Sequence, residues 1–168
     1  MRIVALSAMT VSVFALAATS VAELPKKLVY NGSASAPIGF YWIDDAPAEL
    51  GDFVLLDVPE RVQDLIETRR YLPPGMPLIK RIVAVEGDDE ICRQKREILL
   101  DGVTVAVARN EDRLGRPMPA WQGCRVLRED QIFVLQPHPD SFDGRYFGPV
   151  DRSLVIGRAT RLRFPWQK

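Results

Sequence analysis

Polar and apolar residues alternate along much of the chain after residue 39, which is the pattern of β-strands that lie with one face against a core. The clearest case is the segment PLIKRIVAVEGD at residues 77–88. Its alternation places Arg81 on one face. The other face carries Leu78, Lys80, Ile82 and Ala84. If this second face packs into the core, the Lys80 ammonium is buried there.

Other patterns predict further strands and one loop. The segment EILLDGVTVAV at residues 97–107 predicts a hairpin, because Asp101-Gly102 supplies a positive-φ turn between two β-rich arms. A polar stretch rich in glycine and proline at residues 109–123 predicts a long surface loop. Short apolar runs predict strands at residues 53–58, 130–137 and 154–164.

One segment has helical rather than strand periodicity. Residues 60–70, ERVQDLIETRR, place Val62, Leu65 and Ile66 on one face and charges elsewhere, and Pro73 ends the pattern. The sequence therefore predicts a mainly β body with one short helix.

The N-terminus predicts export. Arg2 precedes an uncharged stretch at residues 3–22, which is long enough to cross a bilayer at about 1.5 Å per residue. Small residues at its end also fit a signal-peptide cleavage site, so the stretch is either a cleaved signal or a retained anchor. We thus divide the chain into a signal or anchor at residues 1–22 and an exported domain at residues 23–168, which opens with a short charged link at residues 23–29.

Composition excludes several classes of function. The 168 residues suit one domain, and 22 Lys+Arg balance 22 Asp+Glu, so no overall field attracts nucleic acid. Two cysteines and one histidine cannot supply the four ligands of a structural zinc site, and we expect no metal or cofactor. His138, between two prolines, predicts a turn. Export allows a Cys92–Cys124 disulfide, and two buried free thiols are the alternative.

The segment NGSASAPIGF at residues 31–40 offers a nucleophile. Ser35 lies among small residues before Pro37 and Gly39, which stiffen the backbone and let a substrate approach. A serine hydroxyl needs a base, and Lys80 is the best one in a chain with a single histidine. Holding an ordinary lysine neutral at pH 7 costs about 4.6 kcal/mol, and burial removes much of that penalty. The alternatives are a turn serine and a lysine that reaches solvent from an edge strand.

Three ordered motifs together resemble the signal peptidase I family of Ser/Lys proteases: SASAP, PLIKRIVAVEGD and SFDGRYFGPV. The likeness is greater to its conjugative-transfer branch, the TraF-type peptidases. The pattern Asn-x-Ser-x-Ser-x-Pro-x-Gly-x-Tyr of that branch is met between Asn31 and Tyr41. Ala36 stands where general leader peptidases usually have Met.

The resemblance implies a role for each matched residue. Ser35 would be the nucleophile, Lys80 the general base, and Ser33 part of the oxyanion hole together with the backbone N–H of Ser35. Residues of the last motif would order the site around the lysine: Ser141, Asp143 and Arg145. The family usually has Ser where this chain has Gly144, which leaves one supporting hydroxyl missing. The implied fold is a partly barrel-like β body.

The resemblance also implies a function. We expect a membrane-tethered serine endopeptidase that processes, or cyclises, conjugative prepilin or similar exported precursors with small residues before the cut. Its catalytic domain would lie in the periplasm, at the inner membrane, with no nucleic-acid partner. A general leader peptidase is one alternative. A catalytically idle assembly component of the conjugation apparatus, suggested by Gly144, is another.

Overall fold

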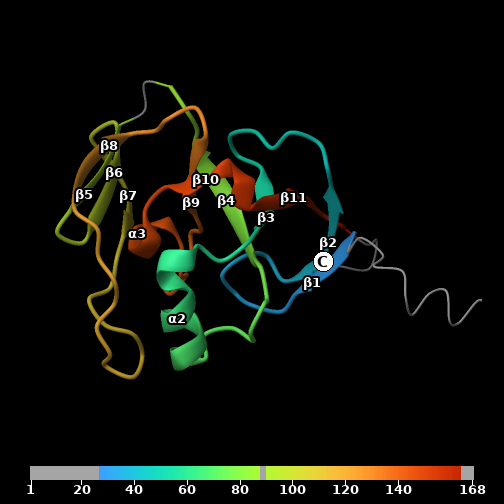
Figure 1. The fold of residues 1–168 in the computed structure, drawn as a ribbon, viewed down its shortest axis with the longest axis horizontal. Coiled ribbons are helices and arrows are strands. Elements are labelled where there is room, and N and C mark those ends of the chain that lie inside the picture. Colours follow the sequence, from blue (N-terminus) through green and yellow to red (C-terminus); the bar gives the residue numbers. More distant parts are fainter. Residues whose placement is uncertain (1–26, 88–89, 164–168) are drawn as a thin grey trace, which may run out of the picture.

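The computed structural model describes residues 27–87 and 90–163, and antiparallel strands form two sheets there (Figure 1). The larger sheet has the strand order β1-β2-β11-β3-β4-β9-β10, and the smaller has the order β7-β6-β5-β8. The mainly β prediction is therefore confirmed, while the expected barrel-like closure stays a prediction.

The strands of the larger sheet are β1 (Leu28–Asn31), β2 (Gly39–Asp44), β3 (Phe53–Leu56), β4 (Leu78–Ala84), β9 (Gln131–Leu135), β10 (Val150–Asp151) and β11 (Val155–Arg161). Those of the smaller sheet are β5 (Glu90–Gln94), β6 (Glu97–Leu100), β7 (Val103–Val107) and β8 (Gly123–Val126). The helical elements are α2 (Glu60–Arg69), α3 (Gly144–Phe147) and the 3-10 turn η1 (Arg152–Leu154).

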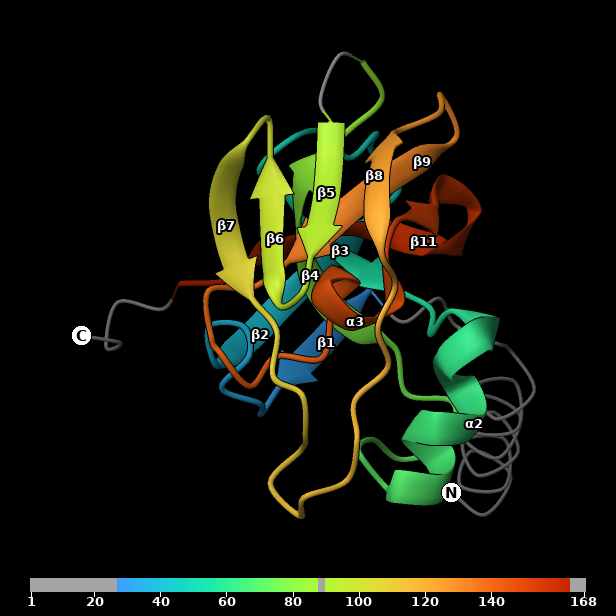
Figure 2. The ribbon, with the colours of Figure 1, turned by 90° about the vertical axis from the view of Figure 1, so that its left-hand side faces the viewer.

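Figure 2 shows the smaller sheet with α3 beside the end of β5. The predicted hairpin is confirmed: Asp101 and Gly102 have φ of 47° and 78° and join β6 to β7. A disulfide links Cys92 on β5 to Cys124, its register partner on β8. Cross-linking residues 32 positions apart contributes roughly 3–4 kcal/mol by restricting the unfolded chain.

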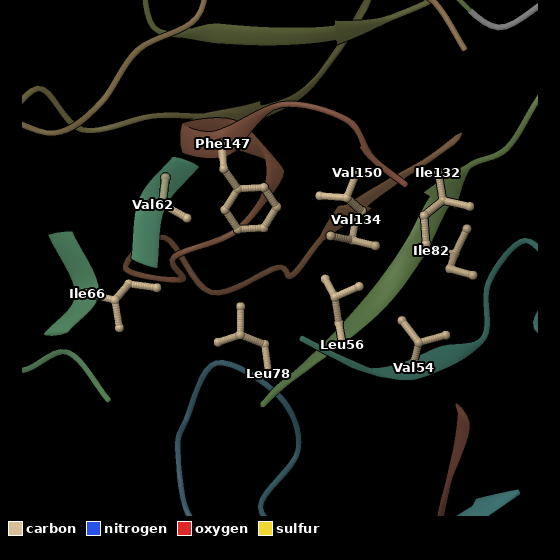
Figure 3. Packing of buried hydrophobic residues seen from close by; sticks show 10 residues of the cluster. All are labelled: Val54, Leu56, Val62, Ile66, Leu78, Ile82, Ile132, Val134, Phe147 and Val150. Carbon is tan, nitrogen blue, oxygen red and sulfur yellow. The ribbon is translucent and has the colours of Figure 1, made fainter. Parts of the chain in front are cut away.

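The main core lies against one face of the larger sheet, where β3, β4 and β9 meet α2 and α3 (Figure 3). It comprises Val54, Leu56, Val62, Ile66, Leu78, Ile82, Ile132, Val134, Phe147 and Val150. Leu78 and Ile82 flank Lys80 along β4, so the lysine lies on the core face, as the alternation predicts. A β-bulge between Ile82 and Ala84 shifts the register. Ala84 therefore packs in a different cluster, contrary to the simple alternation.

The structure differs from two sequence predictions, and the residues of a third lie outside the described ranges. The segment expected to be a charged link overlaps the first two residues of β1, which starts at Leu28. The expected single helix, α2, is joined by α3 and the turn η1 in the described ranges. The predicted signal or anchor segment falls outside the described residues, and within them no helix is long and apolar enough to cross a membrane.

Candidate active site

The Lys80 amine is the most unusual group in the core. Lys80 is 2 % exposed, and its Nζ donates to Ser141 Oγ at 2.9 Å. Burial lowers the pKa of Lys80 from 10.5 to about 8; the Asp143 charge opposes this shift and the Arg145 charge adds to it. At pH 7 about one-tenth of such amines are neutral, so keeping Lys80 uncharged costs only about 1.4 kcal/mol.

Asp143 and Arg145 form a buried ion pair beside this lysine. Arg145 Nε lies 2.7 Å from Asp143 Oδ1, and its Nη2 also donates to Asp143 Oδ2 at 3.0 Å and to the Gln136 carbonyl at 2.6 Å. Asp143 Oδ1 also accepts the backbone N–H of Arg145 and so caps α3. The pair bonds to the backbone on both sides of Ser141: Arg145 donates to the Gln136 and Pro139 carbonyls, and Asp143 accepts the Gln136 N–H. The pair therefore holds the turn that presents Ser141 to Lys80.

The two serines of the first motif contact each other. Ser33 Oγ lies 2.8 Å from Ser35 Oγ and 2.9 Å from Asn31 Oδ1. The carbonyl oxygen of Asn31 can only accept, so the single Ser33 proton is donated to Asn31. The Ser35 hydroxyl therefore donates to Ser33.

The Asn31 side chain shapes the serine turn. Its Nδ2 donates to the carbonyls of Ser33 and Ala36, both at 3.0 Å, and Tyr41 Oη donates to the carbonyl of Pro37 at 2.7 Å. In the sequence, Asn31 is part of a motif, and its role in shaping this turn was not predicted. Its position at the end of a strand and before a turn, where Asn side chains often bond to nearby backbone, was the available signal.

The serine turn packs in a buried cluster that includes a residue of β4, on the face of that strand opposite to Lys80. Ala36, next to Ser35, belongs to the same buried cluster as Ile79, next to Lys80. In the described residues, no hydrogen bond joins Ser35 Oγ to Lys80 Nζ; each is bonded to another serine. The direct Ser35–Lys80 contact therefore stays a prediction.

Gly144 occupies a position with no room for a side chain. A Cβ there would lie 2.6 Å from the Val134 carbonyl oxygen and 2.8 Å from the Phe133 ring. The Gly144 carbonyl also accepts the Trp121 indole N–H at 2.9 Å. The packing around α3 therefore explains why this chain has glycine where the family usually has Ser. Ser141 still bonds to Lys80, and Asp143 still pairs with Arg145.

The remaining candidates for chemistry lie elsewhere. His138 lies in a turn, as predicted, where its Nδ1 accepts the Asp140 N–H. In the part of the chain that the structure describes, one group of potential metal ligands lies together: Glu90, Cys92 and Cys124. Both cysteines of this group form the disulfide, so the group offers no thiolate to a metal.

Comparison with known proteins finds one matching family and relatives that share one name. Residues 1–164 match the family described as "Signal peptidase, peptidase S26". A "Plasmid transfer protein TraF" from Escherichia coli is 31% identical over 136 residues, covering 74% of this chain and 76% of that protein. A "Probable conjugal transfer protein TraF" from Sinorhizobium fredii is 32% identical over 151 residues, covering 79% and 74%. A crystal structure of a signal peptidase I from Enterococcus faecalis aligns with a TM-score of 0.40 and 18% identity, over 68% of this chain and 98% of that chain.

Proposed function

Because the chain belongs to the signal peptidase family, peptidase S26, as the resemblance predicted, we propose that it is a serine endopeptidase in which Lys80 activates Ser35. The observation that supports this most is the buried Lys80 amine, with its pKa lowered to about 8 and its Nζ held by Ser141. A structural lysine gains nothing from such burial, whereas a general base needs it.

In the proposed reaction, the Ser35 hydroxyl turns from Ser33 to neutral Lys80, which takes its proton as Oγ attacks the scissile carbonyl. The backbone N–H of Ser35 stabilises the oxyanion, together with the Ser33 hydroxyl once its proton turns from Asn31 Oδ1 to the substrate. Protonated Lys80 then gives its proton to the leaving amine. The acyl ester on Ser35 is resolved by water, or by an amine of the substrate itself, which would give a cyclic product.

The relatives' names suggest the biological setting. They are named as plasmid or conjugal transfer proteins, and the chain covers about three-quarters of each. On this basis the substrate is an exported precursor of conjugative transfer, such as a prepilin, with small residues before the cut.

The inner membrane is the proposed location, with the catalytic domain in the periplasm. The apolar stretch at residues 3–22 supports it, and so does an apolar stripe on β1 and β2, where Leu28 pairs with Trp42 and Tyr30 with Phe40. These four side chains are between 39% and 59% exposed. A contiguous apolar surface of this kind suits lipid contact. Protease added outside spheroplasts should digest the chain in the membrane fraction; a protected, soluble chain would contradict this location.

Cleavage assays with defined variants test the activity. Purified full-length chain in detergent should cut a peptide that spans a prepilin processing site, and Ser35→Ala and Lys80→Met should each reduce the rate at least 1,000-fold, on the order seen when a catalytic dyad is broken. Ser153→Ala and Lys27→Met, at residues outside the site, should cleave at the wild-type rate. Undiminished cleavage by Ser35→Ala or by Lys80→Met would refute the proposed function.

The same assay separates the alternatives. An idle assembly component would leave every peptide intact, although the chain is folded. A general leader peptidase would cut unrelated exported precursors as fast as a prepilin. We expect faster cleavage of the prepilin.

A further inference from the structure

A polar cavity lies at the end of the smaller sheet that faces α3 (Figure 2). Its volume is about 780 Å³, within the range of roughly 300–1,000 Å³ that is usual for a ligand site. The turn between β5 and β6 lines it, together with the end of β7 and both ends of the loop that follows β7. None of its lining residues belongs to the candidate active site.

The wall of this cavity carries an excess of positive charge. Lys95 and Arg96 contribute exposed cations, Arg93 contributes a buried one, and Glu97 is the acidic residue of the lining. None of the three cations forms an ion pair within residues 27–87 and 90–163. The cavity is therefore suited to a ligand that brings negative charge.

Arg93 is the group that most needs such a ligand. It is 4% exposed, its Nε donates to the Lys95 carbonyl at 3.2 Å, and its Nη1 donates to the Arg145 carbonyl. Both acceptors are uncharged, and Nη2 has no hydrogen bond to a described residue. Burial lowers the pKa of this guanidinium, because no carboxylate offsets the lost hydration. A buried cation without a counter-ion is costly, and an anion in the cavity would remove that cost.

We propose that this cavity binds an acidic segment of a partner protein, with one carboxylate on the Arg93 guanidinium and further acidic side chains on Lys95 and Arg96. The planar guanidinium matches the geometry of a carboxylate, and the two exposed cations sit on the turn that leads to it. This inference goes beyond the proposed function, since binding at the cavity requires no cleavage.

The uncharged part of the lining favours a peptide over a phosphate. Three carboxamides line the cavity: Gln94, Asn110 and Gln122. A carboxamide both donates and accepts hydrogen bonds, and peptide groups use both functions, whereas a phosphate uses only the donors. The Glu97 carboxylate would repel a phosphate but can accept a peptide N–H.

The position of Arg93 separates this partner from the peptide that is cut. Arg93 contacts the carbonyl of Arg145, and Arg145 pairs with Asp143 beside Lys80. A segment held by Arg93 would therefore lie against the support of the candidate active site rather than at Ser35 and Lys80. We expect it to bind together with a prepilin-site peptide and leave the KM for that peptide unchanged.

Calorimetric titration of the full-length chain in an uncharged detergent tests the proposal. A peptide of alternating glutamate and alanine should bind at low salt and weaken as salt is added. Its counterpart with glutamine for glutamate should not bind. Lys95→Gln combined with Arg96→Gln should weaken binding about tenfold, since each exposed ion pair contributes a few-fold at most. Arg93→Lys, which keeps the charge and loses the planar fork, should also weaken it about tenfold.

A matched control uses two cations that lie outside the cavity lining. Lys27→Gln combined with Arg128→Gln removes the same charge and should bind as the wild type does. The Lys95 and Arg96 positions are exposed, so their double variant keeps the test decisive even if Arg93→Lys fails to fold.

Four results would overturn the inference: no binding by the wild type, equal binding by the double variant at Lys95 and Arg96, equal binding of the glutamine peptide, or a raised KM for the prepilin-site peptide. Displacement of the acidic peptide by an equal concentration of inorganic phosphate would also overturn it and assign the cavity to phosphate. Cleavage is measured separately without the acidic peptide. A chain that binds the acidic peptide as expected but cuts nothing would refute the proposed function and leave this inference standing.

Discussion

At the scale of single residues, burial is costly for the Lys80 amine. Among the described residues its amine has one hydrogen bond, to Ser141, and the Asp143 charge nearby is already paired with Arg145. The low pKa of Lys80 therefore results mainly from desolvation. Such a group reduces the stability of the fold, and this reduction should depend on pH.

We expect Lys80→Met to be more stable than wild type at pH 7, by up to about 3 kcal/mol, and the difference to shrink as the pH rises toward 10. Between pH 8 and 10.5 the unfolded chain keeps a proton on Lys80 that the folded chain has lost, so wild-type stability rises with pH in that window. Urea unfolding of both proteins at several pH values measures the difference. A difference that does not change with pH would contradict the lowered pKa.

Asn31 is the second residue whose contacts have a functional consequence. Asn31→Ala removes the acceptor of Ser33 and all three carbonyl contacts of the serine turn, so Ser35 should lose its defined position. We expect kcat to fall about 10- to 100-fold with a small change in KM, because small displacements of a nucleophile have effects of this size. Asn110→Ala, in an exposed loop, is the control in the peptide assay. An unchanged kcat for Asn31→Ala would argue that the turn is held by other contacts.

At the scale of elements, strands with clear alternation were predictable, whereas β1, in the expected charged link, and α3 were not. Alternation identified β4 and placed Lys80 on its buried face, and Asp101-Gly102 identified the hairpin. α3 has only four residues, and its helical turn depends on distant contacts: Trp121 bonds to its first carbonyl, and Arg93 on β5 bonds to the Arg145 carbonyl. No local pattern in the sequence reports such contacts.

The packing of α3 predicts a large effect of the substitution Gly144→Ser, which restores the residue usual in the family. The added Cβ would meet a backbone oxygen and a buried ring, neither of which can move freely. We expect a loss of about 1–3 kcal/mol in the free energy of unfolding, measured by urea titration. Gly32→Ser, whose nearest contact is the Tyr30 side chain at 3.4 Å, should lose less. Equal losses would mean that α3 adjusts to the new side chain.

At the scale of the whole molecule, the smaller sheet supports the site from outside it. Its Arg93 is buried and reaches α3, while the disulfide fixes β8 to β5. The sequence motifs identified the residues of the site, but not their contacts: Ser141 is 61 positions from Lys80, and Gln136 is 57 from Ile79. Contacts over such separations depend on how the strands pair, which alternation alone does not specify.

The central claim is that neutral Lys80 activates Ser35, and the rate of acylation against pH tests it most directly. Full-length chain is mixed with a prepilin-site peptide, quenched in acid, and examined by intact-mass spectrometry and peptide mapping. We predict an acyl adduct on Ser35 that forms about ten times faster for each unit of pH up to a midpoint near 8 and then reaches a plateau. An adduct on another residue, or a rate that does not change between pH 6 and 9, would contradict the account.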